Sequence, residues 1–187
     1  MRFRRKRATE RADSEQSGTE QTGAGQTGIG QAGDVQDGAD QDAAQVLRDL
    51  RRVIDRFGWA VLHGGGSPAD PRYSYTVGLV AWQHPEVIVV GLPFQAGEKY
   101  LNLVGEAVRA GARFTPGAAT TALTDADSPV VFLQVTDVER LSVAEQFSGS
   151  VEALQLVWPD STGLLPWQEG HRNPPAAQPL LGPLPTD

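Results

Sequence analysis

Glutamine recurs every five residues near the start of this chain, at positions 16, 21, 26, 31, 36 and 41, and glycine follows two places after the first five of them. Ile29 and Val35 are the only large apolar residues between positions 13 and 45, so this stretch has little to bury against the entropy of ordering. A stacked structural repeat would need an apolar residue in every unit. We therefore predict a disordered, low-complexity arm over residues 1–41, a globular domain over residues 42–182 and a tail over residues 183–187.

Charge and composition exclude several classes of protein. The net charge of −7 argues against a general nucleic-acid binder, because phosphate binding uses a basic surface. The longest apolar run, residues 87–92, is far shorter than the roughly 20 residues that a bilayer requires. The chain has no cysteine, which excludes disulfide scaffolds, thiolate zinc sites and cysteine nucleophiles. We expect a soluble, cytoplasmic protein that binds neither membranes nor nucleic acids in general.

Two amphipathic helices are predicted in the globular part. Apolar residues recur at helical spacing from Val46 to Phe57, and Gly58 stands where a left-handed residue ends a helix. The start of this helix is expected near residue 42, with Asp40 or Asp42 as its cap. A second apolar stripe predicts a helix over residues 96–110.

Strands are predicted at residues 59–62, 72–81, 87–90, 130–135 and 153–158. The run at 87–90 is uniformly apolar and β-branched, which is typical of a central strand covered on both faces. Ser142 and Glu145 have the spacing of a capping box for a short helix, and the prolines after Trp158 are expected to keep the C-terminal segment extended. Two main helices do not alternate evenly with these strands. The predicted fold is therefore a single α+β domain with a mostly antiparallel sheet of four to six strands.

Most of the common catalytic motifs are incomplete in this sequence. The glycines after His63 resemble an oxyanion-hole segment, but no G-x-S-x-G nucleophile segment accompanies them. The standard phosphate-binding loops are absent as well. His84 and Glu86 straddle a proline and lie on one side of an extended chain, so they could form a general base with its orienting carboxylate. Alternatively, they belong to a loop that caps the entry to the strand at Val87. No histidine has the local helical partner that a metal site would use, so no metal is expected.

The segment after the last strand concentrates special residues. Trp158, Asp160 and Trp167 stand close together among prolines and could wall a binding pocket with Asp160 as its polar group. The alternative is that Asp160 makes an Asx turn and the tryptophans close one end of the core. Gln155, inside an apolar strand, must be hydrogen-bonded or face water, and could line the same pocket.

A family resemblance rests on short segments that are weak singly but specific as an ordered set: Gly58-Trp59, Tyr75-Thr76-Val77-Gly78-Leu79, His84-Pro85-Glu86, Leu101-Asn102, Gly111, residues 154–160, Gly163, Pro166-Trp167 and Gln178-Pro179-Leu180. Over about residues 46–182 this set resembles the bacterial domain-of-unknown-function family 4262, common in actinobacteria. The resemblance implies no particular activity, cofactor or ligand. It marks as candidate ligand-binding residues the positions at which members are most alike: Tyr75, His84, Glu86, Gln155, Trp158, Asp160 and Gln178.

The function stays open among three interpretations, and with it the question of whether the protein is an enzyme. The favoured one is a non-catalytic binding or regulatory module that holds a small ligand or a partner beside Trp158, Pro159 and Asp160. The second is a cofactor enzyme similar to the flavin-binding split barrels. The third is a hydrolase that uses His84, Glu86 and Asp160 as acid–base groups. The cofactor and the partner are not identified by the sequence.

Overall fold

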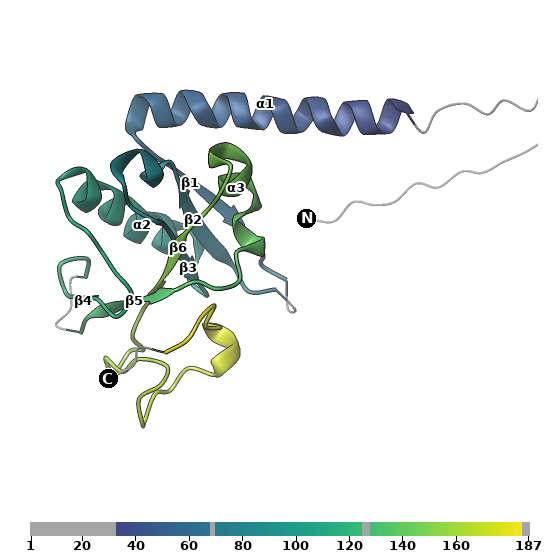
Figure 1. Cartoon of the computed structure of the whole chain (residues 1–187). Coiled ribbons are helices and arrows are strands. Elements are labelled where there is room, and N and C mark those ends of the chain that lie inside the picture. Colours follow the sequence, from purple (N-terminus) through teal and green to yellow (C-terminus); the bar gives the residue numbers. More distant parts are fainter. Residues whose placement is uncertain (1–32, 68–69, 125–127, 185–187) are drawn as a thin grey trace, which may run out of the picture.

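In the part of the chain that the structure describes, six strands form one open sheet in the order β1-β2-β3-β6-β5-β4 (Figure 1). The computed structural model describes residues 33–67, 70–124 and 128–184. Neighbouring strands are antiparallel except β3 and β6, which run parallel. This confirms the predicted α+β domain with a mostly antiparallel sheet, and the open sheet does not close into a small barrel. The strands are β1 (Ala60–Gly64), β2 (Tyr73–Val77), β3 (Glu86–Val90), β4 (Ala119–Thr120), β5 (Val130–Gln134) and β6 (Ala153–Val157).

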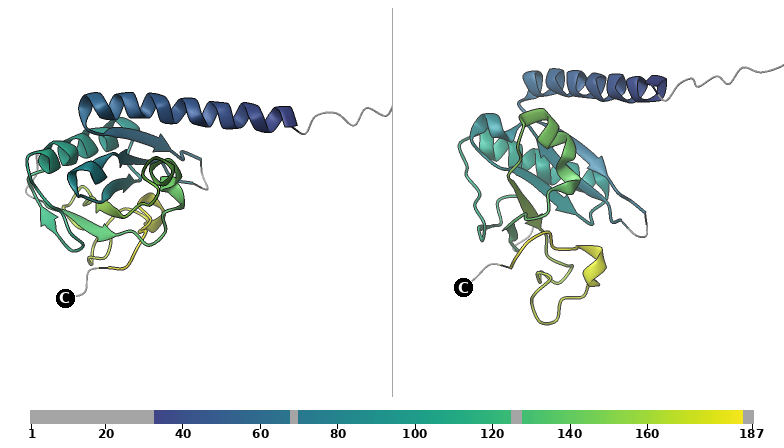
Figure 2. Two further views of the ribbon diagram at one scale, coloured as in Figure 1. Left: turned by 45° about the horizontal axis from the view of Figure 1, so that its top comes forward. Right: turned by 45° about the vertical axis from the view of Figure 1, so that its right-hand side comes forward.

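Helices cover both faces of this sheet (Figure 2). Helix α2 (Phe94–Arg109) packs Leu101, Val104 and Val108 against one face, beside the apolar residues of β3, β5 and β6 that point the same way. On the other face lie α1 (Gly33–Phe57), through Leu50, and α3 (Ser142–Ser148), through Ala144. The described residues also form short 3₁₀ helices: η1 (Leu79–Trp82) lies between β2 and β3, η2 (Glu139–Leu141) precedes α3, and η3 (Pro175–Ala177) lies in the segment after β6.

Strand β3 lies near the middle of the sheet and is buried along its whole length, as its uniformly apolar sequence predicts. Strand β2 is shorter than predicted, because it ends at Val77 rather than at residue 81. Gly78 follows it with a φ of 113°, a left-handed conformation that only glycine adopts readily, and the chain turns there into η1.

Helix α1 begins at Gly33, well before the predicted start near residue 42. Asp40 and Asp42 therefore stand inside the helix and do not cap it, and the last residues of the arm predicted to be disordered, 33–41, are helical. The part of that arm before Gly33 lies outside the described residues. The acids at positions 34, 37, 40 and 42 are all in the N-terminal half of α1, where the helix dipole favours negative charge.

Two predictions about local structure were wrong. The expected capping box does not form, because Ser142 is already helical and the residue before it, Leu141, closes η2. Instead, Asp137 Oδ1 accepts a hydrogen bond from the backbone N–H of Glu139. The proline-rich C-terminal segment is not wholly irregular either, since η3 begins at Pro175, and proline suits the first turn of a helix.

Candidate functional site

Trp158 and Gln178 join the C-terminal segment to the end of the sheet. The Gln178 side chain accepts a hydrogen bond from the Trp158 backbone N–H and donates one to the Trp158 carbonyl, both at 2.9 Å. The indole Nε1 of Trp158 donates to the carbonyl of Val90 at the end of β3, at 2.9 Å. A Cβ on Gly91 would meet the carbonyl of Ala177 at 1.8 Å, so the segment passes β3 at a distance that only glycine permits.

Gln155 performs a similar task in the middle of β6. Its side chain is fully buried, so both of its polar ends need partners. Nε2 donates to the carbonyl of Pro179 at 2.8 Å, and Oε1 accepts from the backbone N–H of Leu181 at 2.7 Å. From the sequence, this glutamine had to be either hydrogen-bonded or exposed to solvent. In the structure its side chain is hydrogen-bonded to the C-terminal segment.

Asp160 organises the loop that follows Trp158. Its Oδ1 accepts hydrogen bonds from the backbone N–H and hydroxyl of Thr162 and from the N–H of Leu164. Its Oδ2 accepts from the N–H of Arg172 at 2.7 Å. The hydroxyl of Thr162 and these amides hold the pKa of Asp160 well below its usual range, although burial opposes them. The predicted Asx turn is therefore present, and the same carboxylate also fixes the distant segment at Arg172.

A cavity of about 580 Å³ lies in this C-terminal segment. The described residues of its walls include no aspartate, glutamate, lysine or arginine. Among the described residues, the Nε2 of His171 is buried without a hydrogen-bond partner, which is unusual for a polar atom. The lining residues are Pro166, Gln168, Gly170, His171, Asn173, Pro174, Pro175, Ala176, Gln178, Pro179 and Leu180.

His84 stands at the other end of β3, immediately before the strand. Its Nδ1 lies 2.7 Å from the carbonyl of Pro85, which can only accept, and its Nε2 lies 3.1 Å from the backbone N–H of Phe114, which can only donate. The ring is therefore neutral, with its proton on Nδ1. Burial lowers the pKa of His84 and nearby Arg113 adds to this, while the bond to Pro85 opposes it.

Glu86 is a buried carboxylate that caps η1. Its Oε2 accepts a hydrogen bond from the hydroxyl of Thr76 at 2.6 Å, and its Oε1 accepts from the N–H of Gly78 at 2.8 Å. The backbone groups of Val80 and Leu79 also contribute hydrogen bonds. Burial raises the pKa of Glu86 despite these donors.

Tyr75 lies between these two ends of the sheet, on β2, where it pairs with Ile88. Its ring stacks against Tyr73 with a centroid distance of 6.2 Å. Burial, with a smaller effect of Tyr73, raises the pKa of the Tyr75 hydroxyl to about 12.

The structure thus divides six of the seven candidate residues into two groups, and Tyr75 on β2 belongs to neither. Gln155, Trp158, Asp160 and Gln178 surround the C-terminal segment, and Gln178 lines its cavity. His84 and Glu86 precede or begin β3, whereas Trp158 follows β6; because β3 and β6 are parallel, the two groups lie at opposite ends of this strand pair. The geometry does not bring His84, Glu86 and Asp160 together as one acid–base site. In the described ranges, no group of three or more histidine or acidic side chains is placed to hold a metal ion.

A family model described as "Domain of unknown function (DUF4262)" matches residues 53–172, which is more than half of the chain. The chain belongs to the DUF4262 family. The match contains all six strands and Asp160, but it begins inside α1 and ends before Gln178. No curated protein and no solved structure matches the chain.

Within this DUF4262 chain, three polar residues of the cavity were not predicted from the sequence: Gln168, His171 and Asn173. A histidine and an asparagine among prolines were the available signal, because a rigid, proline-rich wall with a few polar side chains suits a pocket. No described helix is both long and apolar enough to cross a membrane.

Proposed function

We propose that this protein is a binding module for a small, uncharged molecule, and that the ligand occupies the cavity of the C-terminal segment. The observation that carries the proposal is the cavity itself, whose described lining is rich in proline and includes the polar side chains of His171 and Asn173. A volume of about 580 Å³ lies within the roughly 300–1,000 Å³ of small-molecule pockets.

The lining defines the class of ligand. Prolines and Leu180 provide apolar walls, and the polar groups are those of His171, Asn173, Gln168 and Gln178. Since the described residues of the lining include no fully charged side chain, an ionic ligand would lose its hydration without compensation from them. We therefore expect a neutral molecule with an apolar body and one or two hydrogen-bonding groups, which would bond to the polar side chains of the lining.

The remaining candidate residues support the proposal by fixing the walls. Asp160 holds the N–H of Arg172, which lies between His171 and Asn173 in the chain. Gln178 holds the opposite wall against Trp158. Walls restrained in this way lose little conformational entropy when a ligand binds, which raises affinity. Asp160 and Trp158 are thus positioning residues, whereas His171 and Asn173 would contact the ligand.

Phenol is a suitable first probe, because it is neutral and combines a flat apolar ring with one hydroxyl. Titration with phenol, followed in ¹H–¹⁵N spectra, should shift the backbone signals of residues 168–180 and the side-chain signals of Asn173 and Gln178. The His171→Ala variant should lose most of this response, and the control His63→Ala, which removes a histidine outside the cavity lining, should keep it.

Two results would contradict this function. One is an unchanged spectrum at millimolar phenol, and the other is an equal response in wild type and His171→Ala. Unfolding of either variant would show as a collapse of the whole spectrum, which separates loss of the site from loss of the fold.

A further inference from the structure

A second hollow of about 660 Å³ runs between α1 and α2 above β1. One side is made by Val46, Leu50, Val53 and Phe57 of α1, and Trp59 follows α1 and contributes to the lining. The α2 side is polar, with Glu98, Asn102, Glu106 and Arg109. We call this hollow the α1–α2 groove.

Three of the five α1 residues that line the groove are large, apolar and exposed. The exposed fractions are 52 % for Val46, 41 % for Val53 and 55 % for Phe57, and Leu50 is buried at their centre. The spacing 46, 50, 53, 57 alternates steps of four and three residues, which is the spacing of a helix that packs along another helix. In the sequence this spacing continues toward the N-terminus at Ala39 and Ala43.

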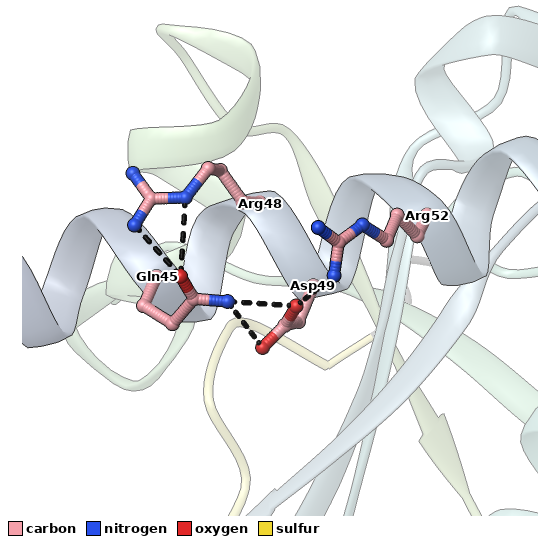
Figure 3. Close-up of polar contacts among 4 residues, drawn as sticks. All are labelled: Gln45, Arg48, Asp49 and Arg52. Atoms are coloured by element: carbon pink, nitrogen blue, oxygen red, sulfur yellow. Dashed lines mark hydrogen bonds and ion pairs between the residues drawn. The ribbon is translucent and has the colours of Figure 1, made fainter.

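A row of polar contacts borders the apolar stripe (Figure 3). Asp49, which lines the groove, accepts two hydrogen bonds from the side-chain amide of Gln45, each at 2.9 Å. It also forms an ion pair with Arg52 at 2.7 Å. Arg48 donates to the carbonyl oxygen of the same Gln45 side chain. Asp49 therefore already has partners on its own helix, and the exposed apolar residues are what the groove offers to another surface.

Helix α1 is longer than the domain that it covers. Its contacts with the core come from Leu47, Leu50 and Ile54, all in its C-terminal half. In every view the first turns of α1 extend past the rest of the domain (Figures 1 and 2). An isolated helix shorter than about 12–15 residues is only marginally stable in water, so a covering partner would stabilise the end of α1 that extends past the domain.

The charges along α1 identify that partner. Residues 33–45 contain four acids and no base, whereas residues 46–57 contain four bases and two acids. Two copies of α1 in antiparallel arrangement would place the acidic half of each beside the basic half of the other. A parallel pair would place like charges together. An acidic N-terminal half and a basic C-terminal half also suit the dipole of a single helix. The orientation of the two helices is therefore tested directly below.

We propose that the α1–α2 groove binds α1 of a second copy of this chain, which forms an antiparallel, two-fold symmetric dimer. The apolar positions fit one register, in which the numbers of facing residues add to 96: Ala39 with Phe57, Ala43 with Val53, and Val46 with Leu50. In the two outer pairs an alanine of one copy faces a large residue of the other, whereas the central pair joins two residues of intermediate size. The same patch is used twice, as two-fold symmetry requires.

Sedimentation of the full chain tests the dimer. Wild type should sediment with the mass of two chains, and Val53→Glu should sediment as one chain while its circular dichroism stays native. Leu103→Glu is the matched control, because Leu103 is similarly exposed, at 38 %, but does not line the groove; it should remain a dimer. A monomeric wild type at tens of micromolar, or a dimer that Val53→Glu leaves intact, would overturn the proposal.

Disulfide cross-linking tests the orientation of the two helices. The chain is suited to this experiment because it contains no cysteine of its own. Ala43→Cys and Val53→Cys proteins are mixed and oxidised. The antiparallel register predicts a disulfide between the two variants and little linkage of either variant with itself, since identical residues would be about 15 Å apart along the axis. Efficient self-linkage of each variant would mean a parallel pair and would overturn the register.

Discussion

The side chain of Gln178 binds the backbone of Trp158 as a neighbouring strand would, with its amide donating to the carbonyl and its oxygen accepting from the N–H, each at 2.9 Å. The side chain of Gln155 hydrogen-bonds the backbone of the same segment a little further along, at Pro179 and Leu181. Two glutamine side chains thus substitute for a strand ladder in a stretch where proline removes backbone donors. The cavity that we assign to ligand binding depends on this attachment.

Gln178→Glu should destabilise the protein by about 1–3 kcal/mol, because a carboxylate can still accept from the Trp158 N–H but cannot donate to its carbonyl. Urea unfolding measures this. Gln168→Glu is the matched control: Gln168 only accepts, from the N–H of Leu165 at 2.7 Å, so a carboxylate there keeps the bond. Equal unfolding midpoints for the two variants would contradict the role assigned to Gln178.

Asp160→Asn should lower the urea midpoint at neutral pH, since an amide group would replace one of the oxygens that accept from Thr162, Leu164 and Arg172. The depressed pKa gives the effect a pH dependence. The stabilisation by the carboxylate is complete above its ordinary pKa of 3.8 and is lost as the pH falls toward the lower value in the folded protein. The difference between wild type and variant should therefore shrink below pH 4. A difference that stays constant down to pH 2 would refute this assignment.

His84 should titrate below its ordinary pKa of 6.5, because burial disfavours the charged ring. Protonation would also place a second N–H against the N–H of Phe114. A lowered pKa means that the unfolded chain binds more protons in this window, so His84 reduces stability as the pH falls from 6.5. Long-range ¹H–¹⁵N spectra near pH 7.5 should show the proton on Nδ1. A proton on Nε2, or a midpoint above 6.5, would be inconsistent with the described contacts.

Thr76→Val should destabilise the protein by about 1–3 kcal/mol, since the hydroxyl donates to Glu86 and accepts from the N–H of Val87. The loss of the donor should raise the pKa of Glu86 further above its ordinary 4.5. For a raised carboxyl pKa, stability is lost as the pH rises through that pKa, so the cost of the substitution should be larger at pH 7 than at pH 4. Chemical denaturation at the two pH values measures it, and an equal cost at both would contradict the account.

The sequence predicted those features of the fold that depend on local periodicity. The apolar run at 87–90 correctly indicated a central strand, and the stripes around Leu50 and Leu101 correctly indicated helices. It did not predict the parallel pairing of β3 with β6, because a pairing between residues more than 60 apart leaves no local pattern. The start of α1 was missed for a similar reason: low hydrophobicity between residues 33 and 42 suggested disorder, and helix formation there depends on continuity with the packed half.

The candidate residues show the same limit. Sequence reasoning offered a hydrogen-bonded Gln155 and an Asx turn at Asp160 each as one of two alternatives, and the structure shows both, since both follow from the chemistry of one side chain. It could not separate His84 and Glu86 from Trp158 and Asp160, because their distance depends on the direction of two strands. It also had no means of finding the unpartnered atom of His171 or the exposed side of α1, which are visible only when the surroundings are known.

Native mass spectrometry of the full chain, incubated with an unfractionated extract of small metabolites, tests the ligand-binding account most directly. Ala176 lines the cavity, and Ala176→Trp would fill it without touching the hydrogen bonds of Asp160 or Gln178. We predict an adduct of a small neutral molecule on wild type that Ala176→Trp lacks. No adduct on wild type, or the same adduct on both proteins, would contradict the account.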